Sequence, residues 1–286
     1  MGAKLWRLVL CLTLAACQAS RPGVRAKSAD LTAPRRGSWM YGVAAVMGDD
    51  PSAAAAQLGT WASGRGVTEL YLALGPVGGL LDNPGLPAFI AGLGAAGVSA
   101  EALIGDAAWT DPVRRERMRE RIRAILTYNA THAEGEGFTA VHLDIENWVT
   151  GTPCAEQPPS CWLPSLTDTY VDAVAMLDGT GLSLAADING IKLRAADLDA
   201  RQAVLDAAGR LLLMIYIQPL GRVEQFANEC MDGIDPGPSA MMVAVQPADF
   251  DQPCDVLPSL DKYFAQTPVY AGASAFDYAR YFALCP

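Results

Sequence analysis

Eight apolar, strand-like runs alternate with helix-like segments between residues 38 and 286, and this alternation predicts a single-domain (β/α)8 barrel, the TIM-barrel fold. The composition, with 51% hydrophobic and 18% charged residues, is that of a globular chain with a large core. The alternative is an open doubly wound sheet, but no GxGxxG or GxxxxGK[ST] follows the first strand. The predicted strands are residues 39–47, 67–74, 98–105, 138–146, 182–188, 211–217, 240–246 and 268–274.

The predicted helices begin at recognisable start signals. Asp50-Pro51 supplies an N-cap and a first-turn proline, and Asp111-Pro112 does the same for a basic amphipathic helix that ends at Tyr128. In that helix Val113, Ile122, Ile125 and Leu126 are expected to form one apolar face. The helices are expected at residues 51–64, 87–96, 111–128, 167–178, 194–208, 221–231 and 257–265.

Residues 1–17 have the pattern of a secretory signal, because Lys4 and Arg7 precede the apolar run of residues 8–14. That run is too short to span a bilayer as a helix. Leu14-Ala15-Ala16-Cys17 resembles a bacterial lipobox. The resemblance implies cleavage before Cys17, lipidation of that cysteine, and export to the outer membrane or cell envelope, with Gln18 beside it indicating the outer membrane. The alternative is an ordinary cleaved signal followed by secretion.

Residues 18–37 are polar and without apolar periodicity, so we expect a flexible tether ahead of a barrel domain over 38–286.

Export makes disulfides plausible, and Cys154 with Cys161 is the expected pair, closing a short Pro-rich loop. Connectivity of the remaining cysteines cannot be read from sequence; Cys230 with Cys254 is the favoured pairing, which leaves Cys285 free. No CxxC or His-rich spacing predicts a metal site, and no cofactor is predicted.

The formal net charge of −10 disfavours a nucleic-acid partner, since phosphate binding needs clustered Lys and Arg. The sequence leaves the oligomeric state open.

Active sites of (β/α)8 barrels form where the strands end at their C-terminal side. Polar residues reach that rim from several predicted strands, although Asp106 and Asp277 have the alternative role of helix caps or turn residues. These residues are Asp106, Asp144, Glu146, Asp187, Tyr216, Gln218, Gln246 and Asp277.

The acidic pair on the fourth strand is the strongest of these features. Asp144 and Glu146 alternate with Leu143 and Ile145, so they share one face of the strand, about 6.5–7 Å apart. Two neighbouring carboxylates raise one pKa, and this supplies a protonated acid near neutral pH. The alternative is an ion pair with an arginine. His142, two residues earlier, is expected to be a buried histidine beneath Asp144 that influences it.

The segment from Gly137 to Glu146, GFTAVHLDIE, resembles the fourth-strand motif DGxDxDxE of chitinase-like glycoside hydrolases of family 18. Asp144 and Glu146 match its last two acids, and Thr139 and His142 stand in place of the first two. The resemblance implies that Glu146 is the general acid/base and that Asp144 orients a 2-acetamido group, which itself attacks the anomeric carbon. Met214-Ile215-Tyr216 resembles the family's sixth-strand MxY, whose tyrosine binds that acetamido group.

The chain also looks similar to a group of bacterial glycosidase-like barrels of unsettled function, which supports the fold. This similarity lies in Gly105-Asp106-Ala107-Ala108-Trp109, the HLDIE segment, Ala186-Asp187-Ile188 and the MIY segment.

Trp109, Trp148 and Trp162 are expected in loops at the same rim, where flat rings stack on sugars; alternatively they cover the barrel mouth. The favoured hypothesis is an exported, membrane-anchored glycoside hydrolase with Glu146, Asp144 and Tyr216 as catalytic residues. Its predicted substrate contacts are Asp106, Trp109, Trp148, Asp187, Gln218, Gln246 and Asp277.

Two alternatives belong to other classes. One is a non-catalytic carbohydrate-binding or envelope scaffold protein on a degenerate barrel. The other is a Mg²⁺ site formed by Asp106, Asp144 or Glu146, and Asp187.

Overall fold

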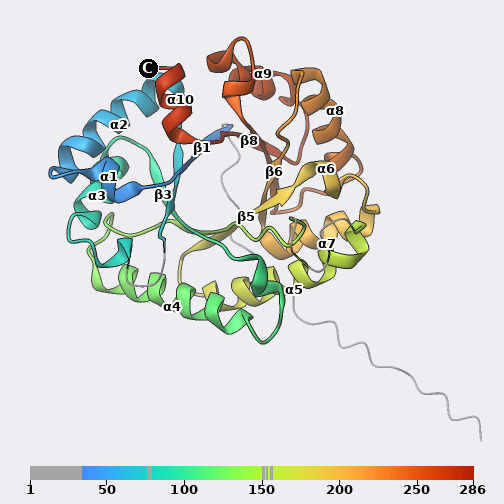
Figure 1. Ribbon diagram of the computed structural model, residues 1–286, viewed down its shortest axis with the longest axis horizontal. Coiled ribbons are helices and arrows are strands. Elements are labelled where there is room, and N and C mark those ends of the chain that lie inside the picture. The colour runs from blue at the N-terminus through green and yellow to red at the C-terminus, as the bar shows by residue number, and fades with distance from the viewer. Residues whose placement is uncertain (1–33, 76–78, 150–151, 153, 155–156) are drawn as a thin grey trace, which may run out of the picture.

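Eight parallel strands close into a barrel in chain order, with β8 hydrogen-bonded to β1 (Figure 1). The structure is a computed structural model, and it describes all residues except 1–33, 76–78, 150–151, 153 and 155–156. The closed barrel confirms the predicted (β/α)8 class. The strands are β1 (Arg35–Met40), β2 (Glu69–Ala73), β3 (Ser99–Ile104), β4 (Ala140–Leu143), β5 (Ser183–Asn189), β6 (Arg210–Met214), β7 (Ala240–Val245) and β8 (Tyr270–Ala275).

Helices surround the strands on all sides (Figure 1). The α-helices are α1 (Val43–Met47), α2 (Pro51–Arg65), α3 (Leu86–Ala95), α4 (Arg115–Thr131), α5 (Pro159–Leu177), α6 (Gly190–Leu193), α7 (Leu198–Ala208), α8 (Leu220–Met231), α9 (Val256–Tyr263) and α10 (Tyr278–Leu284). Four 3-10 turns accompany them: η1 (Leu80–Asp82), η2 (Ala107–Thr110), η3 (Pro247–Asp249) and η4 (Pro253–Asp255).

The first strand differs most from its predicted position. It begins at Arg35, inside the segment expected to be a tether, and ends at Met40, while residues 43–47 form helix α1. Gly42 separates the two elements with a φ of 63°, a left-handed conformation that glycine adopts without steric cost. The run after Gly42 is continuously apolar, so its periodicity does not distinguish strand from helix.

Two helices begin at residues other than those expected. Asp111 holds a turn in which its Oδ1 accepts a hydrogen bond from the Val113 N–H at 2.8 Å, and α4 begins only at Arg115. Val113 is consequently 86% exposed and not part of the apolar face. Helix α5 begins eight residues before the predicted position and contains Pro164, since the prolines around residue 159 lie in its first turns.

Two disulfides link segments of the described chain. Cys154 pairs with Cys161 as predicted. The second disulfide joins Cys254 to Cys285, so the expected pairing of Cys230 with Cys254 is wrong. Cys230 is a buried free thiol on α8. The physical reason is α10, a helix absent from our prediction, which brings the C-terminus beside η4.

The barrel interior is polar along much of its axis. Ser38, Glu69, Glu101, His142, Asp187, Arg210 and Ser274 are all buried. Gly37 makes room among them, because a Cβ there would lie 1.8 Å from the Tyr71 hydroxyl oxygen. These buried polar groups lead from the N-terminal end of the barrel toward the rim that carries the acidic pair.

Candidate active site

Asp144 and Glu146 follow strand β4 at the C-terminal rim, although the strand itself ends three residues earlier than predicted. The Asp144 N–H donates to the Ile104 carbonyl at 3.0 Å, so hydrogen bonding with β3 continues one residue past β4. The alternation therefore holds, and Asp144 shares the inward face with His142. A Cβ at Gly105 would lie 1.9 Å from the Asp144 carbonyl oxygen, so only glycine permits this approach.

The pKa values of both carboxyl groups are shifted upward. Burial raises the pKa of Asp144 well above its usual value, and the carboxylates of Asp187 and Glu146 raise it further. The pKa of Glu146 is raised by burial and then by Asp187, while its hydrogen bond with Asp144 lowers it. The hydrogen bond between them raises the pKa of Asp144 and lowers that of Glu146. It therefore favours a protonated Asp144 as donor and an ionised Glu146 as acceptor.

Two tyrosines stand beside this pair. Burial raises the pKa of the Tyr216 hydroxyl, followed by the charges of Asp187 and Asp144. The pKa of Tyr41 is raised by burial and then by Asp144. The structure thus brings together the predicted trio Asp144, Glu146 and Tyr216 and adds Tyr41, which we did not predict. Tyr41 directly follows β1, so the rule that placed the other rim residues would have found it had the end of β1 been known.

A cavity of about 740 Å³ opens beside Asp144, and we call it the rim cavity. Asp106 and Trp109, both predicted substrate contacts, line it. Asp106 also caps η2, since its Oδ1 accepts a hydrogen bond from the Ala108 N–H at 2.9 Å. The remaining lining residues are Tyr41, Ala73, Gly75, Leu103, Ile104, Gly105, Arg117, Glu120 and Arg121.

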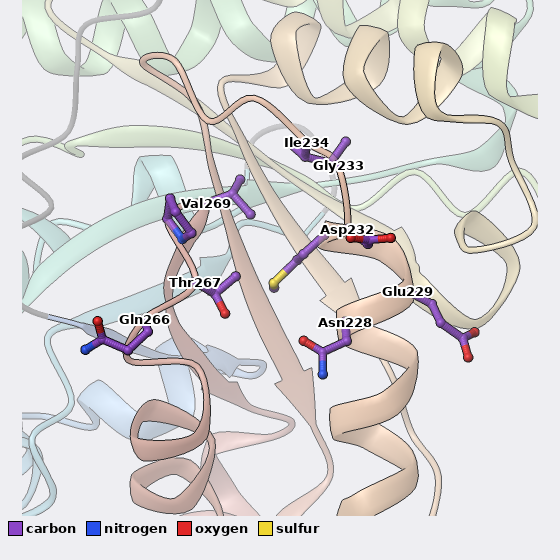
Figure 2. A pocket seen from close by; sticks show the side chains of 10 residues that line it. Asn228, Glu229, Asp232, Gly233, Ile234, Gln266, Thr267 and Val269 are labelled. Atoms are coloured by element: carbon purple, nitrogen blue, oxygen red, sulfur yellow. The ribbon is translucent and has the colours of Figure 1, made fainter.

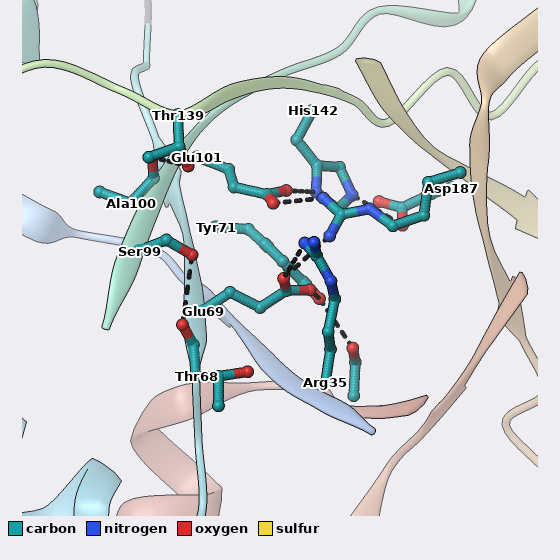
Figure 3. A network of polar contacts seen from close by, with 12 residues as sticks. Arg35, Thr68, Glu69, Tyr71, Ser99, Ala100, Glu101, Thr139, His142 and Asp187 are labelled. Atoms are coloured by element: carbon teal, nitrogen blue, oxygen red, sulfur yellow. Dashed lines mark hydrogen bonds and ion pairs between the residues drawn. The ribbon is translucent and has the colours of Figure 1, made fainter. Parts of the chain in front are cut away.

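Beneath the pair, a chain of buried ion pairs runs along the barrel (Figure 3). His142 Nδ1 lies 3.1 Å from Glu101 Oε2, and its Nε2 lies 3.0 Å from Asp187 Oδ1. Arg210 bonds Glu101 through one guanidinium nitrogen and Glu69 through the other, the latter at 2.8 Å. We call Glu69, Glu101, His142, Asp187 and Arg210 the axial network. Each charge in it has a partner of opposite sign, as burial requires.

The pKa values of the axial network follow from these contacts. Burial alone would raise the pKa of the Glu101 carboxyl, but Arg210 and His142 hold it at about 2. Burial alone would lower the pKa of His142, but Asp187 and Glu101 raise it to about 9. His142 is therefore an imidazolium at neutral pH, which agrees with the expectation of a buried histidine beneath Asp144.

Asp187 occupies a different place from the predicted one. It is 0% exposed, and its two carboxylate oxygens bind His142 and the Trp39 Nε1–H, the latter at 3.0 Å. Asp187 lies within β5 and does not line the rim cavity, in contrast to the position that we predicted for it. The charge of Asp187 raises the pKa of both Asp144 and Glu146.

The free energy of unfolding is expected to depend on pH through His142. Its folded pKa of about 9 exceeds its ordinary 6.5, so its stabilising contribution is complete below pH 6.5 and is lost as pH rises through 9. The loss should approach about 3 kcal/mol, measured by urea unfolding between pH 6.5 and 10. His142→Gln should flatten this dependence, whereas His132→Gln should not. An equal slope in both variants would contradict the assignment.

Trp148 and Trp162 do not line the rim cavity. Both are buried and pack against each other at a ring-centroid distance of 5.3 Å. Neither ring is exposed to a ligand in that cavity, and Trp162 lies in α5 rather than in the loop that we predicted. Trp109 is also largely buried but borders the cavity.

The other predicted contacts lie apart from the acidic pair or serve as caps. Gln218 is exposed, and its side-chain amide donates to the Asp249 carbonyl beside a separate pocket. Gln246 is half-buried at the start of η3 and does not line the rim cavity. Asp277 caps α10 by accepting from the Arg280 N–H at 3.0 Å, and its charge reaches Tyr41.

Figure 2 shows another hollow, of about 490 Å³, between the end of α8 and the segment before β8. Asn228, Glu229 and Thr267 line it. Because these residues precede β7 and β8, the hollow lies at the N-terminal end of the barrel, away from the acidic pair.

Within the described ranges, no cluster of three or more His, Cys, Asp or Glu side chains is arranged to hold a metal ion. The carboxylates of Asp106 and Asp187 are engaged as described, which disfavours the alternative Mg²⁺ site.

None of the helices in the part of the chain that the structure describes is long and apolar enough to span a membrane. The lipobox residue Cys17 lies outside the described residues.

Comparisons with known proteins define the fold class. The structure is similar to an endo-1,4-β-mannanase from Rhizomucor miehei, with 12% identity, 85% of each chain covered and a TM-score of 0.56. It is also similar to a D-psicose 3-epimerase, with 10% identity, 85% of this chain and 84% of that chain covered, and a TM-score of 0.51. A hydrolase and an isomerase match to a similar extent, so the likeness shows the (β/α)8 fold alone.

A chitinase catalytic domain from Ostrinia furnacalis matches with 14% identity over 73% of this chain and a TM-score of 0.44. This chain spans 63% of the length of that domain. No protein-family model and no curated protein sequence matches the chain.

Proposed function

We propose that this protein is a glycoside hydrolase that acts on a polysaccharide, with Asp144 and Glu146 as its acid/base pair. The observation that carries the proposal is a pair of carboxyl groups with raised pKa values beside two buried atoms that lack hydrogen-bond partners. Asp144 Oδ1 and the Tyr216 hydroxyl oxygen are buried and have no hydrogen-bond partner among the described residues. Buried polar atoms are nearly always paired, so these two are the natural contacts of a bound ligand.

The resting pair explains how a proton reaches a glycosidic oxygen. In the proposed resting state, Asp144, whose pKa is raised well above its usual value, holds the proton and donates a hydrogen bond to Glu146. Transfer along that bond protonates Glu146, which then donates the proton to the leaving oxygen as the C–O bond breaks. The charges of Asp187 and of the His142 imidazolium act on Asp144 in opposite directions: Asp187 raises its pKa and His142 lowers it.

The resemblance to family 18 supplies the second half of the reaction. The carbonyl oxygen of a substrate 2-acetamido group would form the bond to the anomeric carbon, with the Tyr216 hydroxyl donating a hydrogen bond to the acetamido group. Water, losing a proton to the Glu146 carboxylate, would then open the cyclic intermediate. This route favours N-acetylated sugars as the substrate class.

A non-catalytic carbohydrate-binding barrel is the second candidate, because the same two unsatisfied atoms could hold a sugar without cleaving it. The test is hydrolysis of aryl glycosides and envelope polysaccharides by protein lacking residues 1–33, together with equilibrium binding of the same sugars. Turnover supports the hydrolase. Binding without turnover supports the second candidate, and the absence of both rejects the two functions together.

We further propose that the protein is exported and anchored through Cys17. Two disulfides support this, since they persist in oxidising compartments. Bacteria expressing the full chain and fed a labelled fatty acid should incorporate label into the protein and retain it in the membrane fraction. Cys17→Ala should abolish labelling, while Cys230→Ala should not. Labelling that survives Cys17→Ala would refute the anchor.

A further inference from the structure

Helix α4 presents two arginines to the rim cavity. Arg117 and Arg121 are four residues apart, so they lie on one face of the helix, and both line the cavity. The neighbouring Arg119 and Arg123 instead form ion pairs with Glu116. No carboxylate of the described residues forms such a pair with Arg117 or Arg121. The arginines on the outer face of α4 are thus neutralised, whereas the two at the cavity are not.

Arg121 is held in place for contact with a ligand. Its Nη2 donates to the carbonyl of Gly75, two residues after the end of β2, and Gly75 is itself part of the cavity wall. Partial burial lowers the pKa of the guanidinium, which nevertheless stays protonated at neutral pH. A partly buried cation is costly unless an anion accompanies it, and the remaining donors of its planar fork suit a carboxylate or a sulfate.

The arginines do not belong to the acid/base pair. The main influences on the pKa of Asp144 and Glu146 are burial, Asp187, His142 and the pair itself, and neither arginine is among them. Because the arginines lie on α4 whereas the acidic pair follows β4, we place a group bound by Arg117 and Arg121 on a different sugar from the one whose bond is broken. Trp109 lines the same cavity and offers an apolar surface to the connecting ring.

Glu120 also lines the rim cavity, and its carboxylate would repel a bound anion. It forms no ion pair with either arginine. At neutral pH the α4 wall carries two positive charges against this single negative one. Asp106 also lines the cavity, and its Oδ1 already accepts a hydrogen bond from the Ala108 N–H. A forked guanidinium binds an anion through paired hydrogen bonds, so two arginines without a carboxylate partner can still hold an anionic group here.

We infer that the rim cavity binds a saccharide bearing a carboxylate or sulfate, with Arg117 and Arg121 holding that anionic substituent on a sugar next to the reacting one. The inference rests on the proposed function for the placement of the reacting sugar. Binding of the charged group can nevertheless be measured without turnover.

The experiment measures equilibrium binding of two sets of paired probes. In the first set, hexuronic acid oligosaccharides of several linkages are each compared with their neutral methyl esters. In the second set, sulfated N-acetylated oligosaccharides are compared with neutral ones. The protein is the Glu146→Gln variant, which prevents hydrolysis. At least one acidic or sulfated probe should bind about 10-fold more tightly than its neutral partner. That preference should fall when salt is raised. The probe that binds identifies the anion as a carboxylate or a sulfate.

Two variants and one matched control locate the site. Arg121→Gln and Arg117→Gln should each remove most of the preference while leaving the neutral partner's affinity unchanged. Arg123→Gln, on the same helix but outside the cavity, should retain the preference. Equal binding of charged and neutral probes, binding of neither, or loss of the preference in Arg123→Gln would overturn the inference. Hydrolysis without a charge preference would uphold the proposed function alone, and a preference without hydrolysis would uphold the inference alone.

Discussion

Glu146→Gln is expected to lower kcat for glycoside hydrolysis by at least ~100-fold, the usual contribution of a general acid/base. Glutamine keeps the shape of the side chain and still accepts the hydrogen bond from Asp144, but it cannot take up or release the proton. Because substrate contacts through Tyr216 and the rim cavity are unchanged, KM should change little. Initial rates on a substrate from the hydrolysis panel measure both constants.

The pH dependence of activity is a second test of the Glu146→Gln variant. Burial and neighbouring carboxylates raise the pKa of both Asp144 and Glu146, so the pair keeps its proton to a higher pH than ordinary carboxyl groups do. Activity of the parent protein should fall as pH rises through the raised pKa of the pair. The residual activity of Glu146→Gln should lack that alkaline limb. Glu116→Gln, an exposed carboxylate on α4, is the control and should behave like the parent protein. A Glu146→Gln variant with more than a tenth of the parent activity would exclude Glu146 as the acid/base.

Alternation along single strands was sufficient to predict the acidic pair and its neighbour Tyr216. Side chains two apart share a face, and parallel strands end at one rim, so Asp144, Glu146 and Tyr216 follow from the chain without knowledge of the register. The burial of Asp187 below the rim could not be predicted in this way, because it depends on how β5 is aligned with its neighbouring strands. β5 extends to Asn189 and pairs Asp187 with Leu212 of β6, which places the side chain below the rim.

The contacts of the axial network likewise could not be predicted from the individual strands. Glu69 and Glu101 begin or interrupt apolar runs, and Arg210 precedes one, so each looks like a solvated strand end. Only barrel closure brings the three side chains together. The same limit applies to Cys254 and Cys285, whose pairing depends on the position of α10. Long-range pairing is fixed by the closed fold and not by local pattern.

Arg210→Met is expected to lower the free energy of unfolding by about 3–5 kcal/mol, the cost of leaving buried charges without their partner. Arg210 is 7% exposed, while Glu69 and Glu101 are 1% and 2% exposed. Methionine fills much of the same volume but carries no charge. Glu69 would then keep Arg35, at 3.3 Å, and the Tyr71 hydroxyl, which donates to its Oε1 at 2.7 Å, while Glu101 would keep only His142. Urea unfolding at neutral pH measures the loss.

The matched control is Arg123→Met, which removes an exposed ion pair with Glu116 and should cost less than about 1 kcal/mol. Combining Arg210→Met with Glu69→Gln and Glu101→Gln should recover part of the stability, because the uncompensated charges disappear with their partner. A loss in Arg210→Met no larger than that in Arg123→Met would mean that the axial network does not hold the barrel together. A large loss rescued by the neutral triple variant would mean that the buried charges, rather than the volume of Arg210, determine the cost.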